Sequence, residues 1–506
     1  MPAIPVVDIF AGAGGLGEGF AAFGQERSSS AFELMASAEM DAQAAQTLRT
    51  RAFFRQFRPA EVPESYYHYA AGQTPQPWTH ATQAQWDAAC HEVMQLRLGD
   101  PEHDKILRGR IRTVSAEAKR RGTPWVLVGG PPCQAFSLIG RARNRGKTGY
   151  VPEDDERHYL YQHYLTILAK FRPAVFVLEN VKGMLSSKLA GQSIFSEMFE
   201  GLQRPGGPRG PRYHIEPLVQ SLHDGNNWQP RDFVVHAEAL GLPQARHRVI
   251  LIGVLEGAAR PISALQPQQE RYTVADMTSG LPRLRSNLTD TSFTSWPKFS
   301  HKLLRNCANY SRSLHKPTAE RLSQLADEAL EGDDIGPGAR WLDGKTNCRM
   351  PAHLDNFIRD PRLNGVINHQ ARAHMASDLM RYGFAAAFTT ENGRSPRGCD
   401  EFPSELHPMH RSWFENNRFV DRFKVQRNDA PSSTVTSHIA KDGHYYIHPD
   451  ALQLRSLTVR EAARLQTFPD NYIFEGPLGS QRRQVGNAVP PWLGYQIASV
   501  VHKALS

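Results

Sequence analysis

Three short runs of mostly apolar residues, each ending in glycine or in a polar residue, constrain the fold more than any other feature. They cover residues 5–10, 125–128 and 174–178. Runs of this kind are typical of strands buried on both faces of a parallel sheet. Segments with helical spacing lie between them, at 40–55, 103–121 and 157–171. This alternation predicts an α/β protein with a Rossmann-like open sheet, whose ligands bind at the carboxyl ends of the strands.

The first run leads into a glycine-rich turn, Ala11-Gly12-Ala13-Gly14-Gly15-Leu16-Gly17, which we expect to open a helix. Glycines there let the backbone approach a ligand and direct amide groups at it from a helix N-terminus. A second strand, at 33–38, ends in Glu39, which can accept hydrogen bonds from two ribose hydroxyls. A solvated surface glutamate is the alternative, and the G-x-G-x-x-G pattern fits a dinucleotide-binding enzyme equally well.

Asp100 is a further candidate for the same site. It follows Leu98-Gly99, after a segment at 56–97 that we interpret as an insertion without an assigned role. Its carboxylate could reach the amino group of an adenine, or it could simply cap the next helix.

Cys133 stands where the strand at 125–128 ends in Gly129-Gly130-Pro131-Pro132. Two glycines and two prolines release a strand into a stiff loop, so we expect an accessible thiol. The alternative is a small buried hydrophobic residue. The five cysteines are scattered and never form a C-x-x-C pair, so neither a disulfide framework nor a metal site is expected.

The strand at 174–178 ends in Glu179, so a thiol and a carboxyl lie at one sheet edge if the two strands are neighbours. This pair has a specific chemical use. A thiolate adds to C6 of a cytosine ring when N3 is protonated or strongly hydrogen-bonded, and a carboxyl in a closed pocket can supply that proton. C5 can then attack an electrophilic methyl group, which a sulfonium cofactor at the glycine turn would provide.

In their order along the chain, the motifs resemble those of DNA (cytosine-5)-methyltransferases of bacterial restriction-modification systems. The matching blocks cover nearly the whole chain: Phe10-Ala11-Gly12-Ala13-Gly14-Gly15, Pro131-Pro132-Cys133-Gln134, Glu179-Asn180-Val181, Gln244-Ala245-Arg246-His247-Arg248, residues 455–466, and Gly486-Asn487-Ala488-Val489-Pro490.

The resemblance implies a role for each matching residue. Cys133 is the nucleophile, Glu179 the partner of N3, Arg248 a residue that holds the base, and Arg246 a buttress of the pocket. Without the resemblance, both arginines would be interpreted as surface charge. S-adenosylmethionine would be bound by a set of residues from both ends of the chain: Phe10, Gly12, Gly14, Gly15, Glu39, Asp100 and Asn487.

The resemblance also predicts the domain organisation. A Rossmann-like S-adenosylmethionine-dependent methyltransferase domain covers 1–270, and a smaller, mostly irregular target-recognition domain covers 271–475. The segment 476–506 returns to the first domain, and its helix, from Ala488 to about Lys503, should pack beside the Gly12 turn.

Charge favours a polyanionic partner, because Lys plus Arg number 59 against 51 for Asp plus Glu. We expect double-stranded DNA, with the target base swung out of the helix and a basic loop at 141–149 closing over it. A cognate restriction endonuclease could share the target sequence.

No apolar run approaches the length of a membrane span, and we expect a cytoplasmic monomer. Three alternatives stay open: a transfer-RNA cytosine-5 methyltransferase, a nicotinamide oxidoreductase, and a DNA-binding protein without catalysis.

Overall fold

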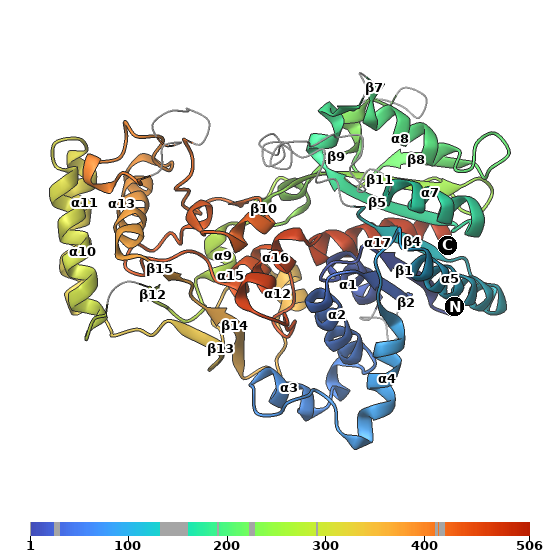
Figure 1. Cartoon of the computed structure of the whole chain (residues 1–506), viewed down its shortest axis with the longest axis horizontal. Coiled ribbons are helices and arrows are strands. Elements are labelled where there is room, and N and C mark those ends of the chain that lie inside the picture. The colour runs from blue at the N-terminus through green and yellow to red at the C-terminus, as the bar shows by residue number, and fades with distance from the viewer. Residues whose placement is uncertain are drawn as a thin grey trace.

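The computed structural model describes residues 2–24, 31–131, 160–189, 192–221, 228–289, 292–409, 413 and 420–506. Cys133 and the basic segment 141–149 therefore lie outside the described residues. The predicted α/β class is confirmed: a sheet forms the centre of one half of the molecule, and helices cover it (Figure 1). No helix in the described ranges is long and apolar enough to cross a membrane.

The large sheet has eight strands in the order β3-β2-β1-β4-β5-β11-β8, with β9 paired to β11. Five strands run parallel, and β11 is antiparallel to β5, β8 and β9. The strand order reverses between β1 and β4, which makes their carboxyl ends the expected ligand site. The strands are β1 (Ile4–Ile9), β2 (Phe32–Glu39), β3 (Val93–Gln95), β4 (Val126–Gly129), β5 (Val175–Val181), β8 (Tyr213–Pro217), β9 (Val234–His236) and β11 (His247–Leu255).

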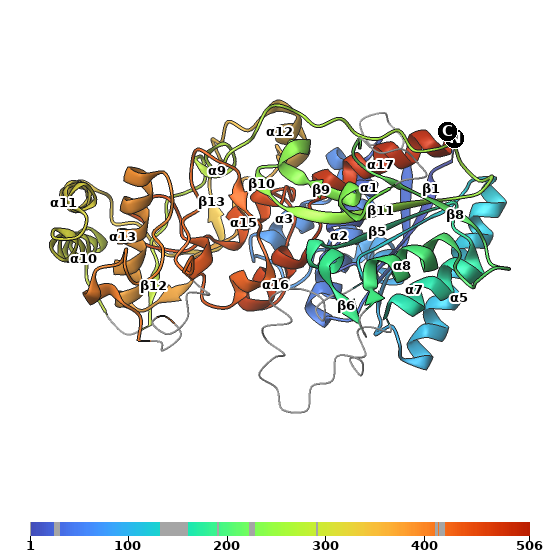
Figure 2. The same ribbon diagram turned by 90° about the horizontal axis from the view of Figure 1, so that it is seen from above.

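Both faces of this sheet are buried, which explains the near-continuous apolar runs. Alternate residues of a strand enter different cores: Val6 packs under α1 (Gly15–Ala22) and α17 (Pro491–Leu505), while Val7 belongs to the opposite core. Three helices cover that opposite face, α5 (Pro101–Arg121), α7 (Leu160–Phe171) and α8 (Ile194–Gln203). Figure 2 shows α17 and the group of α5, α7 and α8 on different sides of the sheet.

The C-terminal helix α17 packs on α1, as expected from the sequence, although the two are far apart along the chain. The contact is made by glycines. An ideal Cβ on Gly19 would lie 2.3 Å from the backbone carbon of Gly494, so no other residue fits between the two helices. The last segment of the chain is thereby fixed beside the glycine turn.

The other half of the molecule contains more helix than the mostly irregular region that we expected. Here α10 (Trp296–Ser311), α11 (Lys316–Glu331) and α13 (Ala376–Asn392) pack together around a core of their own (Figure 1). In α10, only one face is apolar, at Leu303, Leu304 and Cys307 among others, and polar residues cover the rest. A helix with a single apolar face has no long apolar run in its sequence. The sequence analysis therefore did not predict these helices.

Shorter elements join the two halves around a further apolar core. They are α9 (Val274–Thr278), β13 (Gly338–Asp343), α12 (Ala352–Ile358), β14 (Gly365–Gln370), α15 (Val459–Leu465) and α16 (Leu478–Asn487). The helix α2 (Ala42–Arg55) follows β2 and packs against α4 (Gln83–Glu92) and β3.

The insertion at 56–97 is ordered and bridges the two halves. It contains α3 (Glu64–Ala70) and α4 (Gln83–Glu92), and β3 at its end adds an edge strand to the sheet. The Tyr67 hydroxyl donates to Asp360 Oδ2 at 2.9 Å, and Arg362 donates to the Val62 carbonyl at 2.6 Å and pairs with Glu64. The insertion thus holds the segment at 360–362 against the half that contains the large sheet.

Candidate active site

The glycine turn lies at the switch point of the sheet and has the backbone geometry expected of a ligand loop. Phe10, Gly12 and Gly14 all have positive φ, at 56°, 59° and 80°, and Gly14 is the N-cap of α1. A Cβ on Gly12 would meet no atom within 4 Å among the described residues, so the space before the turn is open. Phe10 is a non-glycine residue in the left-handed region, which is uncommon and concentrates at functional sites.

Glu39 is tied to this turn by its own carboxylate. The Gly12 amide donates to Oε2 at 2.9 Å and the Asp41 amide donates to Oε1 at 2.8 Å. Burial raises the pKa of Glu39 above its ordinary value, against these two bonds. The carboxylate is therefore oriented by backbone amides at the end of β2 and is not a loosely solvated surface group.

The far end of the chain meets the same turn. An ideal Cβ on Gly15 would lie 1.9 Å from the carbonyl oxygen of Val489, so only glycine allows this approach. The Tyr472 hydroxyl donates to the Ala13 carbonyl of the same turn. Asn487, the exposed last residue of α16, precedes Val489 by two positions and is thus carried to the turn.

Asp100 caps a helix, which was the alternative interpretation. Its Oδ1 accepts from the amides of Glu102 and His103 at 3.0 and 3.1 Å, at the start of α5. The hydrogen bond from His103 is the main reason that the pKa of Asp100 is lowered. The chain passes Glu39 just before this point, where the Leu96 amide donates to the Glu39 carbonyl at 2.9 Å. A contact with adenine stays a prediction.

Glu179 lies near the C-terminal end of β5. This strand extends to Val181, whereas the sequence predicted that it ends at residue 178. The strands β4 and β5 are parallel neighbours, with Gly129 opposite Leu178. The strand that leads toward Cys133 and the strand that carries Glu179 therefore end at the same edge of the sheet. A Cβ on Gly130 would lie 3.0 Å from Glu179 Oε2, and Asn180 donates to the Pro131 carbonyl at 3.4 Å. The described chain that leads toward Cys133 therefore passes directly beside the carboxyl of Glu179.

Arg248 holds the same carboxyl from the next strand. In the antiparallel pairing of β11 with β5, Arg248 is opposite Val181, two residues beyond Glu179. Its Nε lies 2.9 Å from Glu179 Oε1, and about 13% and 14% of the two side chains is exposed. A partly exposed ion pair at a strand end leaves room for a ligand to contact both groups.

Arg246 is buried, which excludes surface charge as its interpretation. Only 1% of the residue is exposed, and its guanidinium donates to the carbonyls of Val435 at 2.7 Å and Ala488 at 2.8 Å. Burial, followed by the neighbouring charge of Arg248, lowers the pKa of Arg246 to about 9. Arg246 thus ties three distant segments together behind the Glu179–Arg248 pair.

Sequence reasoning assigned no role to two polar residues of this region. Gln244 is buried and connects its own segment to α15 and to Val435. Its Nε2 donates to the carbonyl of Leu465, the last residue of α15, at 3.1 Å, and its Oε1 accepts from the Val435 amide at 2.8 Å. Asp8 is buried within β1, where burial and then the charge of Glu39 raise its pKa to about 8. The available signals were an acidic residue inside an apolar run for Asp8 and, for Gln244, its place at the start of the matching block 244–248.

The fold and the site together define a class, the S-adenosylmethionine-dependent methyltransferases. The features that define it are the parallel sheet extended by an antiparallel strand, the glycine turn at the switch point, and the acidic end of the second strand. The fold is similar to that of a solved Escherichia coli structure, a candidate DNA modification methyltransferase encoded within a prophage. The TM-score is 0.52 at 20% sequence identity, and 99% of each chain is covered.

The family follows from the sequence comparisons. The family model of C-5 cytosine-specific DNA methylases matches residues 76–503, and the chain belongs to this family. It is a DNA (cytosine-5)-methyltransferase of the kind found in restriction-modification systems. The family and the fold imply S-adenosylmethionine as the methyl donor.

Curated relatives span nearly the same length. The type II methyltransferase M.Bpa9945I of Bacillus paralicheniformis is 31% identical over 524 residues, with 99% of each chain covered. The type II methyltransferase M.AgeI of Thalassovita gelatinovora is 27% identical and covers 75% of this chain and 83% of its own. The DNA (cytosine-5-)-methyltransferase M.ApeKI of Aeropyrum pernix is 27% identical, with 75% of this chain and 81% of its own covered.

Proposed function

We propose that the enzyme forms a bond between the sulfur of Cys133 and C6 of a cytosine turned out of duplex DNA, with Glu179 at N3. The observation that carries the proposal is the position of Glu179. Its Oε2 lies 3.0 Å from where a Cβ on Gly130 would be, three residues before Cys133. A pyrimidine seated on Glu179 is then within reach of the chain that bears the thiol.

In this mechanism each residue has one task. The Cys133 thiolate forms the S–C6 bond while Glu179 donates a proton to N3, which moves the ring electrons toward C5. Arg248 orients the Glu179 carboxyl through the contact at 2.9 Å, and Arg246 keeps that strand in place from behind. After C5 has been methylated, a base removes the C5 proton, and the C5–C6 double bond re-forms as the S–C6 bond breaks. The thiolate of Cys133 departs and the proton on N3 returns to Glu179, so both residues are restored.

The cofactor site that we propose is the open space before the glycine turn. S-adenosylmethionine, when bound, supplies an electrophilic methyl group. Gly12, Gly14 and Gly15 would present backbone at this site, and Glu39, fixed by two amides, would accept from the ribose hydroxyls. Phe10, Asp100 and Asn487 complete the predicted set of contacts.

Residues 271–475 are our candidates for reading the DNA sequence, with 1–270 and 476–506 forming the catalytic unit. A base inside a duplex is stacked, and turning it out costs a few kcal/mol, which contacts with the phosphate backbone must offset. We further propose that the enzyme acts as a monomer, on a sequence shared with a cognate restriction endonuclease.

Duplex DNA containing 5-fluorocytosine tests the covalent step. The fluorine at C5 cannot be removed as a proton is, so the wild-type enzyme should stay bound to the DNA through denaturing electrophoresis when the methyl donor is present. Cys133→Ala should give no such adduct while it still binds the reaction product S-adenosylhomocysteine. An adduct that persists in Cys133→Ala would refute the assignment of the nucleophile.

A matched pair of arginine variants tests the role of the Glu179 contact. Arg248→Ala should lower methyl transfer at least a hundred-fold. Arg212→Ala removes a similar but exposed pair with Glu256, at 3.3 Å, and should leave the rate unchanged. Labelled methyl donor with either duplex DNA or transfer RNA separates the proposed substrate from the RNA alternative, and labelling of the RNA alone would contradict the proposal.

A further inference from the structure

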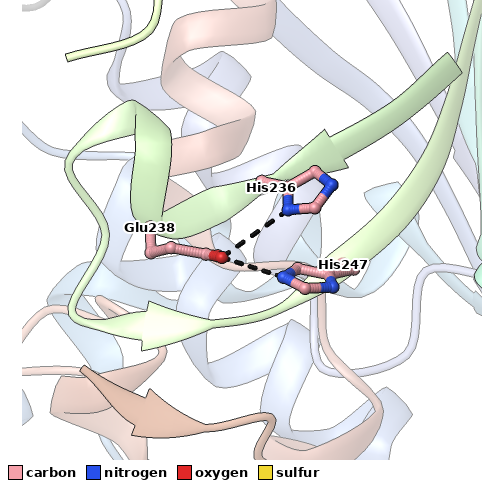
Figure 3. Close-up of side chains that lie close together, drawn as sticks. All are labelled: His236, Glu238 and His247. Atoms are coloured by element: carbon pink, nitrogen blue, oxygen red, sulfur yellow. Dashed lines mark hydrogen bonds and ion pairs between the residues drawn. The ribbon is translucent and has the colours of Figure 1, made fainter. Parts of the chain in front are cut away.

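His236, Glu238 and His247 lie together at the edge of the catalytic sheet and have no part in the mechanism above. His236 ends β9, His247 begins β11, and the two are direct cross-strand partners. Glu238 lies two residues after His236, in the short helical turn Ala237–Leu240. Figure 3 shows both imidazole rings directed at the same carboxylate oxygen of Glu238.

The three side chains have the spacing of metal ligands. His247 Nε2 lies 2.8 Å and His236 Nδ1 lies 3.7 Å from Glu238 Oε1, and one ligand atom of each residue lies within 4.8 Å of the others. Zinc bonds to histidine nitrogen and carboxylate oxygen are about 2.0–2.2 Å long, which separates tetrahedral ligands by roughly 3.2–3.6 Å. The observed separations lie on both sides of this range, so small rotamer changes would bring all three atoms onto one ion.

The surroundings fit a bound cation better than a simple hydrogen bond. Glu238 Oε2 is buried and has no hydrogen-bond partner among the described residues, although buried carboxylate oxygens normally have one. The two imidazole rings are packed with centroids 4.0 Å apart, which disfavours two positive charges. Side-chain exposures of 49% for His236 and 34% for His247 leave a path for an ion and a position for a water ligand.

We infer that His236, Glu238 and His247 form a binding site for one divalent transition-metal ion of the zinc class. Two imidazoles, one carboxylate and a water complete a tetrahedral set for such an ion. The ion would join β9 to β11 at His247, the residue between Arg246 and Arg248. The sequence predicted no metal site because only cysteine spacing was considered, and here His-x-Glu and a histidine nine residues later are brought together by strand pairing.

Competition for Zn²⁺ with a chromophoric chelator tests this inference on the full-length enzyme after EDTA treatment and desalting. We expect one equivalent per chain, with affinity reduced at least ten-fold in His236→Ala and in His247→Ala. His214→Ala is the matched control, because His214 faces Glu256 at 3.7 Å with similar exposure and no third ligand in the described part of the chain. Equal Zn²⁺ uptake by wild type and the His236→Ala/His247→Ala double variant, or an equal loss in His214→Ala, would overturn the inference.

Two further measurements do not depend on methyl transfer. Co²⁺ added to the wild-type protein should give the intense visible absorption bands of a tetrahedral site, and Zn²⁺ should abolish them. Zn²⁺ should also raise the thermal midpoint of the wild type and of His214→Ala, but not that of Glu238→Gln. Weak bands typical of six-coordinate Co²⁺, or an equal thermal shift in Glu238→Gln, would contradict a site built from these three side chains.

Discussion

Replacing Gly19 by alanine should destabilise the enzyme, although the same change in most helices is stabilising. The added Cβ would lie 2.3 Å from the Gly494 carbon and the Tyr495 nitrogen and 2.4 Å from the Pro491 oxygen, whereas ordinary contact begins at 3.4 Å. All three are backbone atoms of α17, so α1 and α17 must separate by about 1 Å. Overpacking of this kind costs about 1–3 kcal/mol or more, against a gain of ~1 kcal/mol from helix propensity.

Gly109 supplies the matched control for this prediction. It lies inside α5, and a Cβ there would meet no atom within 4 Å. Gly109→Ala should therefore raise the free energy of unfolding by roughly 0.5–1 kcal/mol. Urea unfolding followed by circular dichroism should show midpoints that move in opposite directions for the two variants. Equal or higher stability of Gly19→Ala would refute the direct backbone contact between α1 and α17.

Three further predictions concern pH and the bridge at 56–97. Asp8 holds a proton up to about pH 8 in the folded state but only up to about pH 4 in the unfolded state. The free energy of unfolding of the wild type should therefore fall as the pH rises from 4 to 8, by at most ~1.4 kcal/mol per pH unit. Urea midpoints of Asp8→Asn should lack this slope. His369, whose pKa burial lowers to about 4, binds its proton below pH 6.5 only when unfolded. Stability should therefore be lost as pH falls from 6.5 to 4, and less so in His369→Asn. Arg362→Ala removes bonds to the carbonyls of Ala60 and Val62, and limited proteolysis should then cut within 56–97 faster than in the wild type. Arg321→Ala, which removes a pair with Glu328 within α11, should not change the rate of cutting there.

Local patterns were sufficient for the central strands of the large sheet but not for β3, β8 or β9. The apolar runs predicted β1, β4 and β5, because a strand that is buried on both faces is apolar along its whole length and can be recognised from its own sequence. The sequence left open whether β4 and β5 are neighbours, and the structure shows that they are, with Gly130 beside Glu179. The return of α17 to α1 was also predictable, because a helix with one apolar face must bury it.

Long-range contacts between polar groups could not be predicted. Arg246 donates to Val435, 189 residues away, and its acceptor is a backbone carbonyl that every residue type carries. No residue pattern distinguishes the correct carbonyl from the others. The His236–Glu238–His247 cluster likewise depends on the register of β9 with β11, in which His236 is opposite His247. A slip of one residue in this register would move the side chains of the strand to the other face of the sheet.

Buried arginines are the common solution by which this chain joins its distant segments. Arg460, 1% exposed, donates to the carbonyls of Ile367 at 2.9 Å, Pro469 at 2.9 Å and Tyr472 at 2.7 Å. Burial lowers the pKa of Arg460 to about 10, so its guanidinium is still charged at neutral pH. A planar fork of five N–H donors reaches several carbonyls at fixed angles, whereas a lysine ammonium cannot match that geometry. Arg246 uses the same arrangement behind Glu179, and the geometry of the candidate site therefore depends on backbone acceptors contributed by segments far from β5 and β11.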